Sequence, residues 1–169
     1  YPVPQHICEI TNGLIDQNVL HFDKSANDDM TLTYHDSCNV ARASSMGGIM
    51  GGQFTIPRKI IQTVANNFYD MDDETIREKT YCCGGGGGLL TDDLMELRVK
   101  GALPRMEALK HLIEEKGVTH MAAICAICKS QFSKVFQYYD LELDQIVSLH
   151  QLVSNACLLY TSPSPRDTA

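Results

Sequence analysis

The sequence predicts an α/β fold, a parallel sheet with helices on both faces. Short runs of β-forming and apolar residues alternate along the chain with longer runs at helical spacing. Cysteines stand where three of these segments turn toward a helix, at Cys38, at Cys82 and Cys83, and at Cys125 and Cys128. A chain of 169 residues is long enough to bury one core of ordinary size, so a single domain is expected.

The first half predicts a helix, a strand and two more helices. Residues 5–19 carry apolar side chains on one stripe and predict an amphipathic helix. Residues 31–34 alternate and predict a strand, after which three polar residues precede a helix that begins near Cys38. Four glycines within residues 44–53 predict an irregular loop, and Pro57 is expected to start the next helix.

The middle of the chain predicts a helix with an interruption. Thr91, with two aspartates behind it, is suited to a helix start, and apolar spacing continues to a stop at Gly117. Pro104 lies within this stretch and is expected to interrupt the helix, because proline lacks the N–H that a helix interior uses.

The last part repeats the alternation. Residues 118–124 predict a buried strand that ends at Cys125 and leads into a helix. Residues 141–147 predict another strand, and Ser148 is suited to cap a closing helix that ends at Ala156. Strands separated by helices in this way predict parallel pairing.

Composition narrows the class of protein. The net charge of −7 and the absence of any lysine or arginine run argue against nucleic acid and against an anionic membrane surface. No stretch approaches the roughly 18 apolar residues of a spanning helix, so no transmembrane segment is expected. Seven cysteines, most of them clustered, favour reduced thiolates in a cytoplasm over a disulfide framework.

Features at both ends of the sequence predict that the chain is a fragment of a longer subunit. The chain opens on Tyr1, and its composition changes abruptly over residues 157–169. That segment predicts a non-native or disordered tail, which leaves residues 1–156 as the domain.

The five clustered cysteines predict a metal centre. Thiolates are soft ligands that select zinc, copper(I) or iron-sulfur clusters. A four-cysteine zinc site normally uses two spaced pairs, and the adjacent Cys82 and Cys83 make an awkward bite for one tetrahedral ion. The spacing also differs from that of ferredoxins. A cluster of several iron atoms therefore fits better, with a structural zinc module left open.

The neighbouring motifs each have a plainer interpretation. Gly84 to Gly88 can be a linker, or a phosphate loop that lacks the Lys-Ser/Thr ending, or glycines that let the backbone approach cluster sulfides. The third interpretation gives Gly84 and Gly85 a place at the cofactor. Cys125 and Cys128 alone are also typical of a thioredoxin-like dithiol.

Other candidates divide between chemistry and packing. His35 and Asp36 precede Cys38 and can supply protons to a departing thiolate, although capping and hydrogen bonding explain them nearly as well. Arg42 can offset cluster charge or form an exposed ion pair. Cys8 lies on the inward stripe of the first helix and is expected to be a small buried hydrophobe.

These motifs together carry a family resemblance. His35-Asp36-Ser37-Cys38, Cys82-Cys83 with the glycines after it, and Cys125-Ala-Ile-Cys128 resemble one complete CCG module, the cysteine-rich domain of heterodisulfide reductase catalytic subunits. The resemblance spans residues 1–156, with Ser37 where the family commonly has proline. The residues around the motifs are most similar to those of the K subunit (DsrK-type) of the membrane complex associated with dissimilatory sulfite reduction.

The resemblance implies a cofactor, a reaction and partners. The implied cofactor is a noncubane 4Fe-4S cluster on all five cysteines, with further cubane 4Fe-4S clusters on a missing N-terminal part. The implied reaction is one-electron-step reduction of a di- or trisulfide on a small sulfur-carrier protein with redox cysteines, with His35 as the catalytic candidate. A membrane subunit with haem would oxidise quinol and hold the chain at the inner face of the cell membrane. An electron-transfer subunit of a glycolate or lactate oxidising complex is the alternative.

Overall fold

The computed structural model describes residues 4–89, 91–142 and 145–158. Its centre is a three-stranded parallel sheet in the order β1 (Leu32–Tyr34), β2 (His120–Ala123) and β3 (Ile146–Ser148). Thr33 pairs with Met121, and Ala122 pairs with Val147. The predicted parallel α/β architecture is therefore confirmed.

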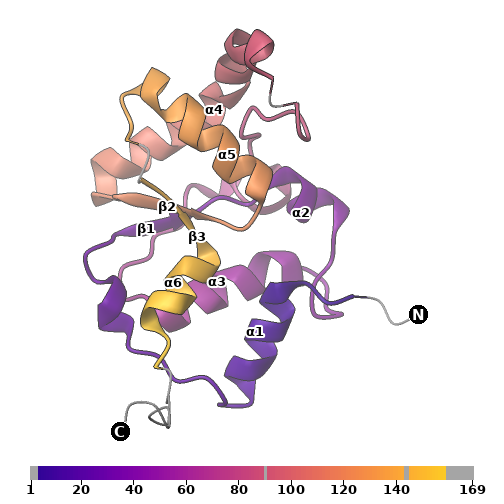
Figure 1. Ribbon diagram of the computed structural model, residues 1–169, viewed down its shortest axis with the longest axis vertical. Coiled ribbons are helices and arrows are strands. Elements are labelled where there is room, and N and C mark those ends of the chain that lie inside the picture. The colour runs from indigo at the N-terminus through magenta and orange to yellow at the C-terminus, as the bar shows by residue number, and fades with distance from the viewer. Residues whose placement is uncertain (1–3, 90, 143–144, 159–169) are drawn as a thin grey trace, which may run out of the picture.

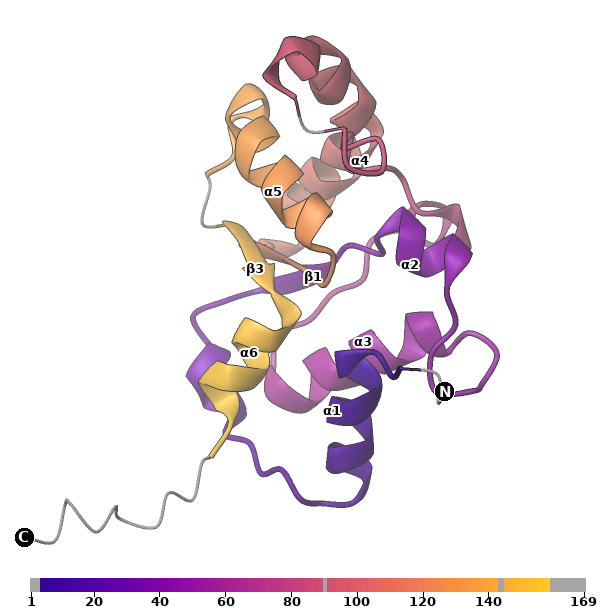
Figure 2. The ribbon, with the colours of Figure 1, turned by 45° about the vertical axis from the view of Figure 1, so that its right-hand side comes forward.

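Helices cover both faces of this sheet (Figures 1 and 2). The helices on one face are α1 (Ile7–Asp16), α3 (Gly52–Val64) and α6 (Leu149–Ala156). On the other face lie α4 (Met95–Lys116) and α5 (Ala126–Val135), and α2 (Cys38–Ala43) stands beside the end of the sheet. Short 3-10 segments connect these elements, among them Lys24–Asn27, Asp73–Thr75, Arg77–Lys79, Asp92–Leu94 and Phe136–Tyr139.

Each helical layer closes its own apolar cluster against the sheet. Leu32 and Ala122 belong to the cluster that also holds Ile60, whereas Met121 belongs to the cluster that holds Phe132. Successive strand residues point to opposite faces, so neighbours such as Met121 and Ala122 divide between the two layers. β1 and most of β2 are thereby buried on both sides, whereas β3 is partly exposed.

The prediction that Pro57 starts a helix was wrong, because α3 begins five residues earlier at Gly52. Gly51 takes a left-handed conformation with φ +76° at the N-cap. A Cβ on Gly52 would stand 2.0 Å from the carbonyl oxygen of Met46, so only glycine fits there. Pro57 lies just over one turn after the start of α3. Because proline has no N–H, it removes the one hydrogen bond that residue 57 would donate to the carbonyl of Gln53 in the first turn.

The predicted interruption at Pro104 was also wrong, because α4 runs unbroken from Met95 to Lys116. Pro104 and Lys100 both lie on the exposed side of the helix. Water can therefore hydrogen-bond the carbonyl of Lys100 that the proline leaves unpaired. The predicted stop at Gly117 is confirmed, with φ +64° and its N–H donating to the carbonyl of Ile113.

Boundaries elsewhere differ by a few residues. The first helix is shorter than predicted and begins after His6, whose ring accepts from the backbone N–H of Cys8. Of the predicted strand at 141–147, residues 143–144 lie outside the described residues, and β3 starts only at Ile146. Cys157 follows α6, and its backbone N–H donates to the carbonyl of Val153. Residues 159–169 of the predicted tail lie outside the described residues. Across the described ranges, no helix is long and apolar enough to cross a membrane.

Candidate metal centre

Sheet topology brings two of the cysteine groups together. β1 and β2 are parallel neighbours, so their carboxyl ends reach the same edge of the sheet. Cys38 opens α2 shortly after β1, and Cys125 follows β2 as the N-cap of α5. The backbone N–H of His35 donates to the carbonyl of Ala122 at 2.9 Å and keeps the two strand ends paired beyond β1.

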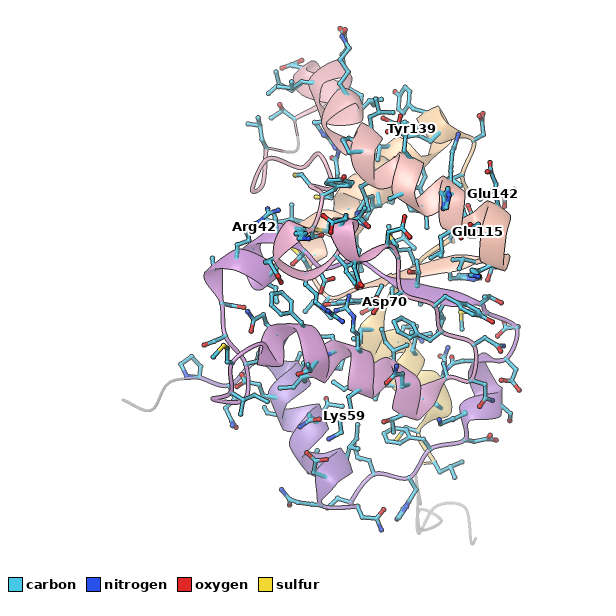
Figure 3. The ribbon with its side chains drawn as sticks, turned by 180° about the vertical axis from the view of Figure 1, so that it is seen from behind. Arg42, Lys59, Asp70, Glu115, Tyr139 and Glu142 are labelled. Carbon is cyan, nitrogen blue, oxygen red and sulfur yellow. The ribbon has the colours of Figure 1, made fainter. Side chains whose placement is uncertain are left out.

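The third cysteine group comes from the connection between α3 and α4. Its approach to the sheet edge is fixed by Thr80, whose hydroxyl donates to the carbonyl of Asp36 at 2.7 Å. Arg42 donates to the carbonyls of Glu78, at 3.0 Å, and Thr80. Arg42 therefore anchors the segment that leads into Cys82 (Figure 3), rather than forming the exposed ion pair that was considered from the sequence.

The thiols form a contiguous group. Cys83 accepts a hydrogen bond from the thiol of Cys82, and the single thiol proton of Cys128 is shared between the sulfurs of Cys83 and Cys125. Cys38 lies close enough to Cys82 to raise the pKa of the Cys82 thiol electrostatically. Cys83 and Cys128 are buried, whereas Cys38, Cys82 and Cys125 are partly exposed. All of the seven cysteines are free of disulfides.

Hydrogen bonding lowers the pKa of some of these thiols and raises the pKa of others. The thiol hydrogen bond from Cys128, aided by the backbone N–H groups of Cys128 and Ile127, lowers the pKa of Cys125 to about 6. Hydrogen bonds from Cys128 and Cys82 likewise lower the pKa of Cys83. The pKa of Cys128 is raised because it donates to Cys125 and Cys83 and is desolvated. The lowered pKa values of Cys83 and Cys125 favour the thiolate, which is the form that binds metal.

The glycines after Cys83 let the backbone pass close to other groups. Gly84 has φ +83°, and a Cβ there would lie 2.2 Å from the carbonyl oxygen of Arg98 in α4. Its N–H donates to the sulfur of Cys82 at 3.3 Å. A Cβ on Gly85 would lie 3.3 Å from the sulfur of Cys83. Both glycines, singled out from the sequence, therefore lie directly against the thiol group.

The structure separates the two polar residues that precede Cys38. Asp36 accepts from both terminal nitrogens of Arg58, at 2.9 and 2.7 Å, and from the N–H of Arg77 at 2.8 Å. Arg58 also binds Asp70, which Figure 3 labels, so Asp36 is committed to a buried ion-pair network. His35 lies within the site but outside this network.

His35 is fully buried, and its ring meets the ring of Phe132 edge-on with the centroids 4.9 Å apart. Burial, with a smaller contribution from the positive charge of Arg105, lowers the pKa of His35 to about 3. Neither ring nitrogen has a hydrogen-bond partner within the described part of the chain. His35 is therefore a neutral imidazole with a free N–H and a free acceptor nitrogen.

Cys8 lies in the other layer of the molecule, away from the five cysteines. It is fully buried in the apolar cluster with Leu32 and Val64, and burial raises the pKa of its thiol to about 12. The prediction that Cys8 is a small buried hydrophobe is confirmed.

Sequence reasoning missed three arginines that the fold buries around the site, Arg58, Arg98 and Arg105. Arg98 donates to the side chain of Gln131 at 2.8 Å, directly behind Gly84. The signal was present, because Arg98, Ala102, Arg105 and Leu109 recur at helical spacing on the buried stripe of α4. An arginine on such a stripe indicates an internal partner rather than solvent.

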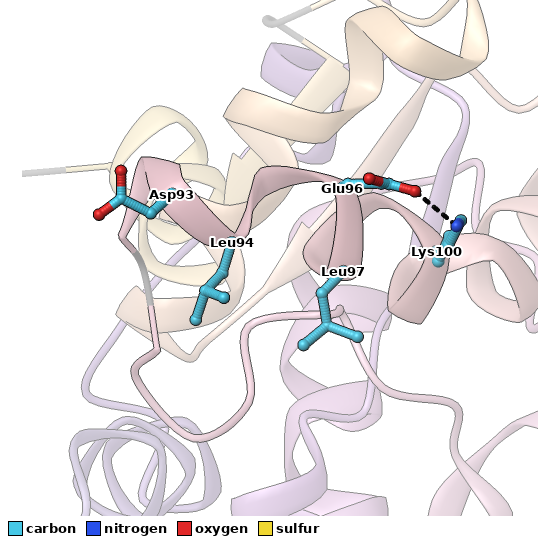
Figure 4. Close-up of a pocket in the computed structure, with 5 residues that line it drawn as sticks. All are labelled: Asp93, Leu94, Glu96, Leu97 and Lys100. Atoms are coloured by element: carbon cyan, nitrogen blue, oxygen red, sulfur yellow. Dashed lines mark hydrogen bonds and ion pairs between the residues drawn. The ribbon is translucent and has the colours of Figure 1, made fainter.

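A surface pocket of about 300 Å³ lies elsewhere, at the start of α4 (Figure 4). Leu94 and Leu97 line it together with the ion pair between Glu96 and Lys100. None of the five cysteines lines this pocket, so it is separate from the thiol group.

The thiol group suits a metal cluster in two respects. Its ligand atoms are all thiol sulfurs, which are soft and favour iron-sulfur clusters among other soft metals. Polar atoms around it are buried without partners in the described ranges, namely the ring nitrogens of His35, the hydroxyl of Ser37, Nη2 of Arg98 and Nε of Arg105. Such orphaned donors match the sulfur acceptors of a bound cluster. Among the described side chains, no three His, Cys, Asp or Glu form a ready-made site for a single ion.

Comparisons with known proteins identify a family and two similar relatives. The cysteine-rich domain family, CCG, matches residues 32–133, a range that contains all five clustered cysteines. The chain is 42% identical over 154 residues to the Hdr-like menaquinol oxidoreductase iron-sulfur subunit 2 of Archaeoglobus fulgidus. It is 43% identical over 154 residues to the Hdr-like menaquinol oxidoreductase iron-sulfur subunit of Archaeoglobus profundus. Each alignment covers 91% of this chain and 26% of the relative, so the chain spans about a quarter of their length. No solved structure matches the chain.

Proposed function

The chain belongs to the cysteine-rich domain family, CCG, and from that premise we propose that it is the iron-sulfur module of a heterodisulfide-reductase-like oxidoreductase. The observation that carries the proposal is the convergence of five thiols from three distant segments at one edge of the sheet. Cys38, Cys82, Cys83, Cys125 and Cys128 would hold a noncubane 4Fe-4S cluster, with the backbone of Gly84 and Gly85 against the sulfurs.

The reaction is the reduction of a sulfur-sulfur bond, in which one disulfide takes up two electrons and two protons and yields two thiols. When bound, the cluster supplies one-electron transfer and iron sites that accept a substrate sulfur. The electrons come from oxidation of a quinol by a haem-containing membrane partner, through cubane 4Fe-4S clusters on a part of the protein outside this chain. The two archaeal relatives are named as menaquinol oxidoreductase subunits, which supports the quinol link.

The protein side chains determine how a substrate approaches. Cys83 and Cys128 are buried, whereas Cys38, Cys82 and Cys125 are partly exposed. The exposed three define the side from which a di- or trisulfide on a small sulfur-carrier protein would enter. The buried two exclude water from the inner side of the site.

His35 is the residue we assign to the sulfur chemistry. Its imidazole is neutral and buried, and both of its nitrogens are without partners in the described part of the chain. A neutral ring carries one N–H, which can donate to a sulfur that gains negative charge as the S–S bond breaks. Asp36 is left out of this role because Arg58 and Arg77 hold it.

The test is the response of the loaded protein to a thiol. The chain is reconstituted without oxygen, oxidised by one electron and mixed with a small thiol or with the matched thioether. We expect the EPR spectrum to change with the thiol and to stay the same with the thioether, because a thiolate binds an open iron site far more strongly than a neutral thioether does. If the EPR spectrum is unchanged by the thiol while the protein still transfers electrons, an electron-transfer subunit is favoured, such as one in glycolate or lactate oxidation.

A further inference from the structure

Arg105 is a fully buried cation on the inner stripe of α4. Its guanidinium donates to the hydroxyl of Thr80 at 2.9 Å, to the carbonyl of Thr75 and to the sulfur of Met71. Its Nε has no partner in the described ranges. These contacts fix the position of the charge without neutralising it, since every partner is uncharged.

The other two buried arginines at the site each have a carboxylate within ion-pair distance, although Asp92 beside Arg98 is exposed and also pairs with Lys134. Arg58 pairs with Asp36 and Asp70, and Arg98 lies 3.6 Å from a carboxylate oxygen of Asp92. Within the described residues, no carboxylate forms an ion pair with Arg105. Desolvation strongly destabilises an unpaired charge in a protein interior, so a compensating negative charge nearby is expected.

The charge of Arg105 lies behind the cysteine loop. Thr80, which it binds, precedes Cys82 by two residues, and the ring of Tyr81 lies 5.7 Å from the guanidinium carbon. Burial lowers the pKa of Arg105 to about 10, and the negative charges of Asp36 and of the Cys128 thiolate form oppose this shift. The thiol group is therefore within electrostatic reach of the guanidinium.

We propose that Arg105 is the charge that sets the reduction potential of the cluster held by the five cysteines. This inference rests on the proposed function. Reduction adds one electron to a site that already carries thiolate ligands, and a fixed positive charge in a medium of low dielectric stabilises the added negative charge. Arg105 thus acts as a positioning residue through electrostatics, without touching the substrate.

The experiment is a redox titration, followed by EPR, of the full chain after anaerobic reconstitution. Arg105→Gln removes the charge and keeps hydrogen-bond donors. We expect it to shift the one-electron equilibrium at least tenfold toward the oxidised form, which is about 59 mV to lower potential. Arg105→Lys keeps the charge and is expected to recover most of that shift. Lys100→Gln removes an exposed charge from the same helix and is expected to leave the potential unchanged.

Iron content distinguishes the failures. Full iron with an unshifted potential in Arg105→Gln overturns the inference and leaves the proposed function standing. If that variant loads no iron, Arg105→Lys decides: loading with a potential near that of the unaltered chain supports the role of charge. Failure of Arg105→Lys to load overturns it, since shape and hydrogen bonding are then what matters. No iron in the unaltered chain overturns both proposals.

Discussion

At the scale of single residues, Cys83 and Cys8 are both buried thiols in opposite environments. Cys83 accepts two thiol hydrogen bonds, whereas Cys8 is surrounded by apolar side chains. We expect Cys83→Ser to lose or convert the cluster, and Cys8→Ser to leave cluster absorbance nearly intact at a cost of about 1–3 kcal/mol in folding free energy. Absorbance, iron content and thermal unfolding measure both variants. Equal loss of iron from the two would refute the assignment of ligands.

His35 gives a prediction that separates chemistry from packing. His35→Ala is expected to retain the cluster and to slow disulfide turnover in the complete complex by about 10²-fold, the lower end for losing one hydrogen-bond donor to a developing negative charge. Turnover and iron content are measured on the same preparation. Unchanged turnover would reduce His35 to a packing partner of Phe132.

Residue chemistry was predictable from the sequence where a side chain has one strong preference. The clustered cysteines and the apolar position of Cys8 followed from spacing. The role of Arg42 did not, because its acceptors are the backbone carbonyls of Glu78 and Thr80, which spacing cannot reveal. Arg105 was missed for a related reason, since its partners lie in segments distant in sequence.

At the scale of elements, the glycine loop offers a matched pair. Gly84 and Gly87 both have positive φ, of +83° and +74°. A Cβ on Gly84 would meet the carbonyl of Arg98, whereas a Cβ on Gly87 has no atom within 4 Å. We expect Gly84→Ala to displace the loop from α4 and to lose iron. Gly87→Ala should cost about 1 kcal/mol of backbone strain and keep its iron. Similar iron contents in both variants would show that the approach to α4 does not matter.

The two prolines explain why element boundaries were harder to predict than elements. Both Pro57 and Pro104 lie inside helices that continue around them. Each is tolerated because the carbonyl it leaves free lies near a helix end or in solvent, which depends on the fold and not on the local sequence. By contrast, Gly117 ended its helix as predicted, since a left-handed C-cap is a local requirement.

At the scale of the whole molecule, the buried neutral His35 makes stability depend on pH. Its pKa in the folded chain is about 3, whereas the unfolded chain has the ordinary value of 6.5. Between these values the unfolded state binds more protons, so the free energy of unfolding falls as pH falls. For the metal-free protein we expect a loss of about 2 kcal/mol from this group between pH 6.5 and 4.5.

The control for this pH dependence is His35→Gln, which cannot titrate in that range. Denaturant unfolding of both proteins at several pH values measures the difference, and carboxylates or His150 affect both equally. Parallel curves for the two proteins would mean that His35 has its ordinary pKa in the folded state, and hence that its ring is solvated there.

The overall architecture was predictable because alternating strand and helix patterns leave few solutions. Parallel pairing then places Cys38 and Cys125 at one edge without further information. The position of Cys82 and Cys83 was beyond prediction from local pattern, because it depends on contacts from Thr80 and Gly84 to distant segments. The sequence joined all three groups through the shared chemistry of their thiols and through the family resemblance, not through a local pattern.

The central claim is that five cysteines hold one iron-sulfur cluster, and metal analysis tests it most directly. Iron, acid-labile sulfide and zinc are measured on the chain purified and reconstituted without oxygen, with Cys83→Ser beside it. The account predicts about four iron and four sulfide per chain, with both lost or reduced in the variant. About one zinc with no iron would contradict it and leave a structural zinc module in its place.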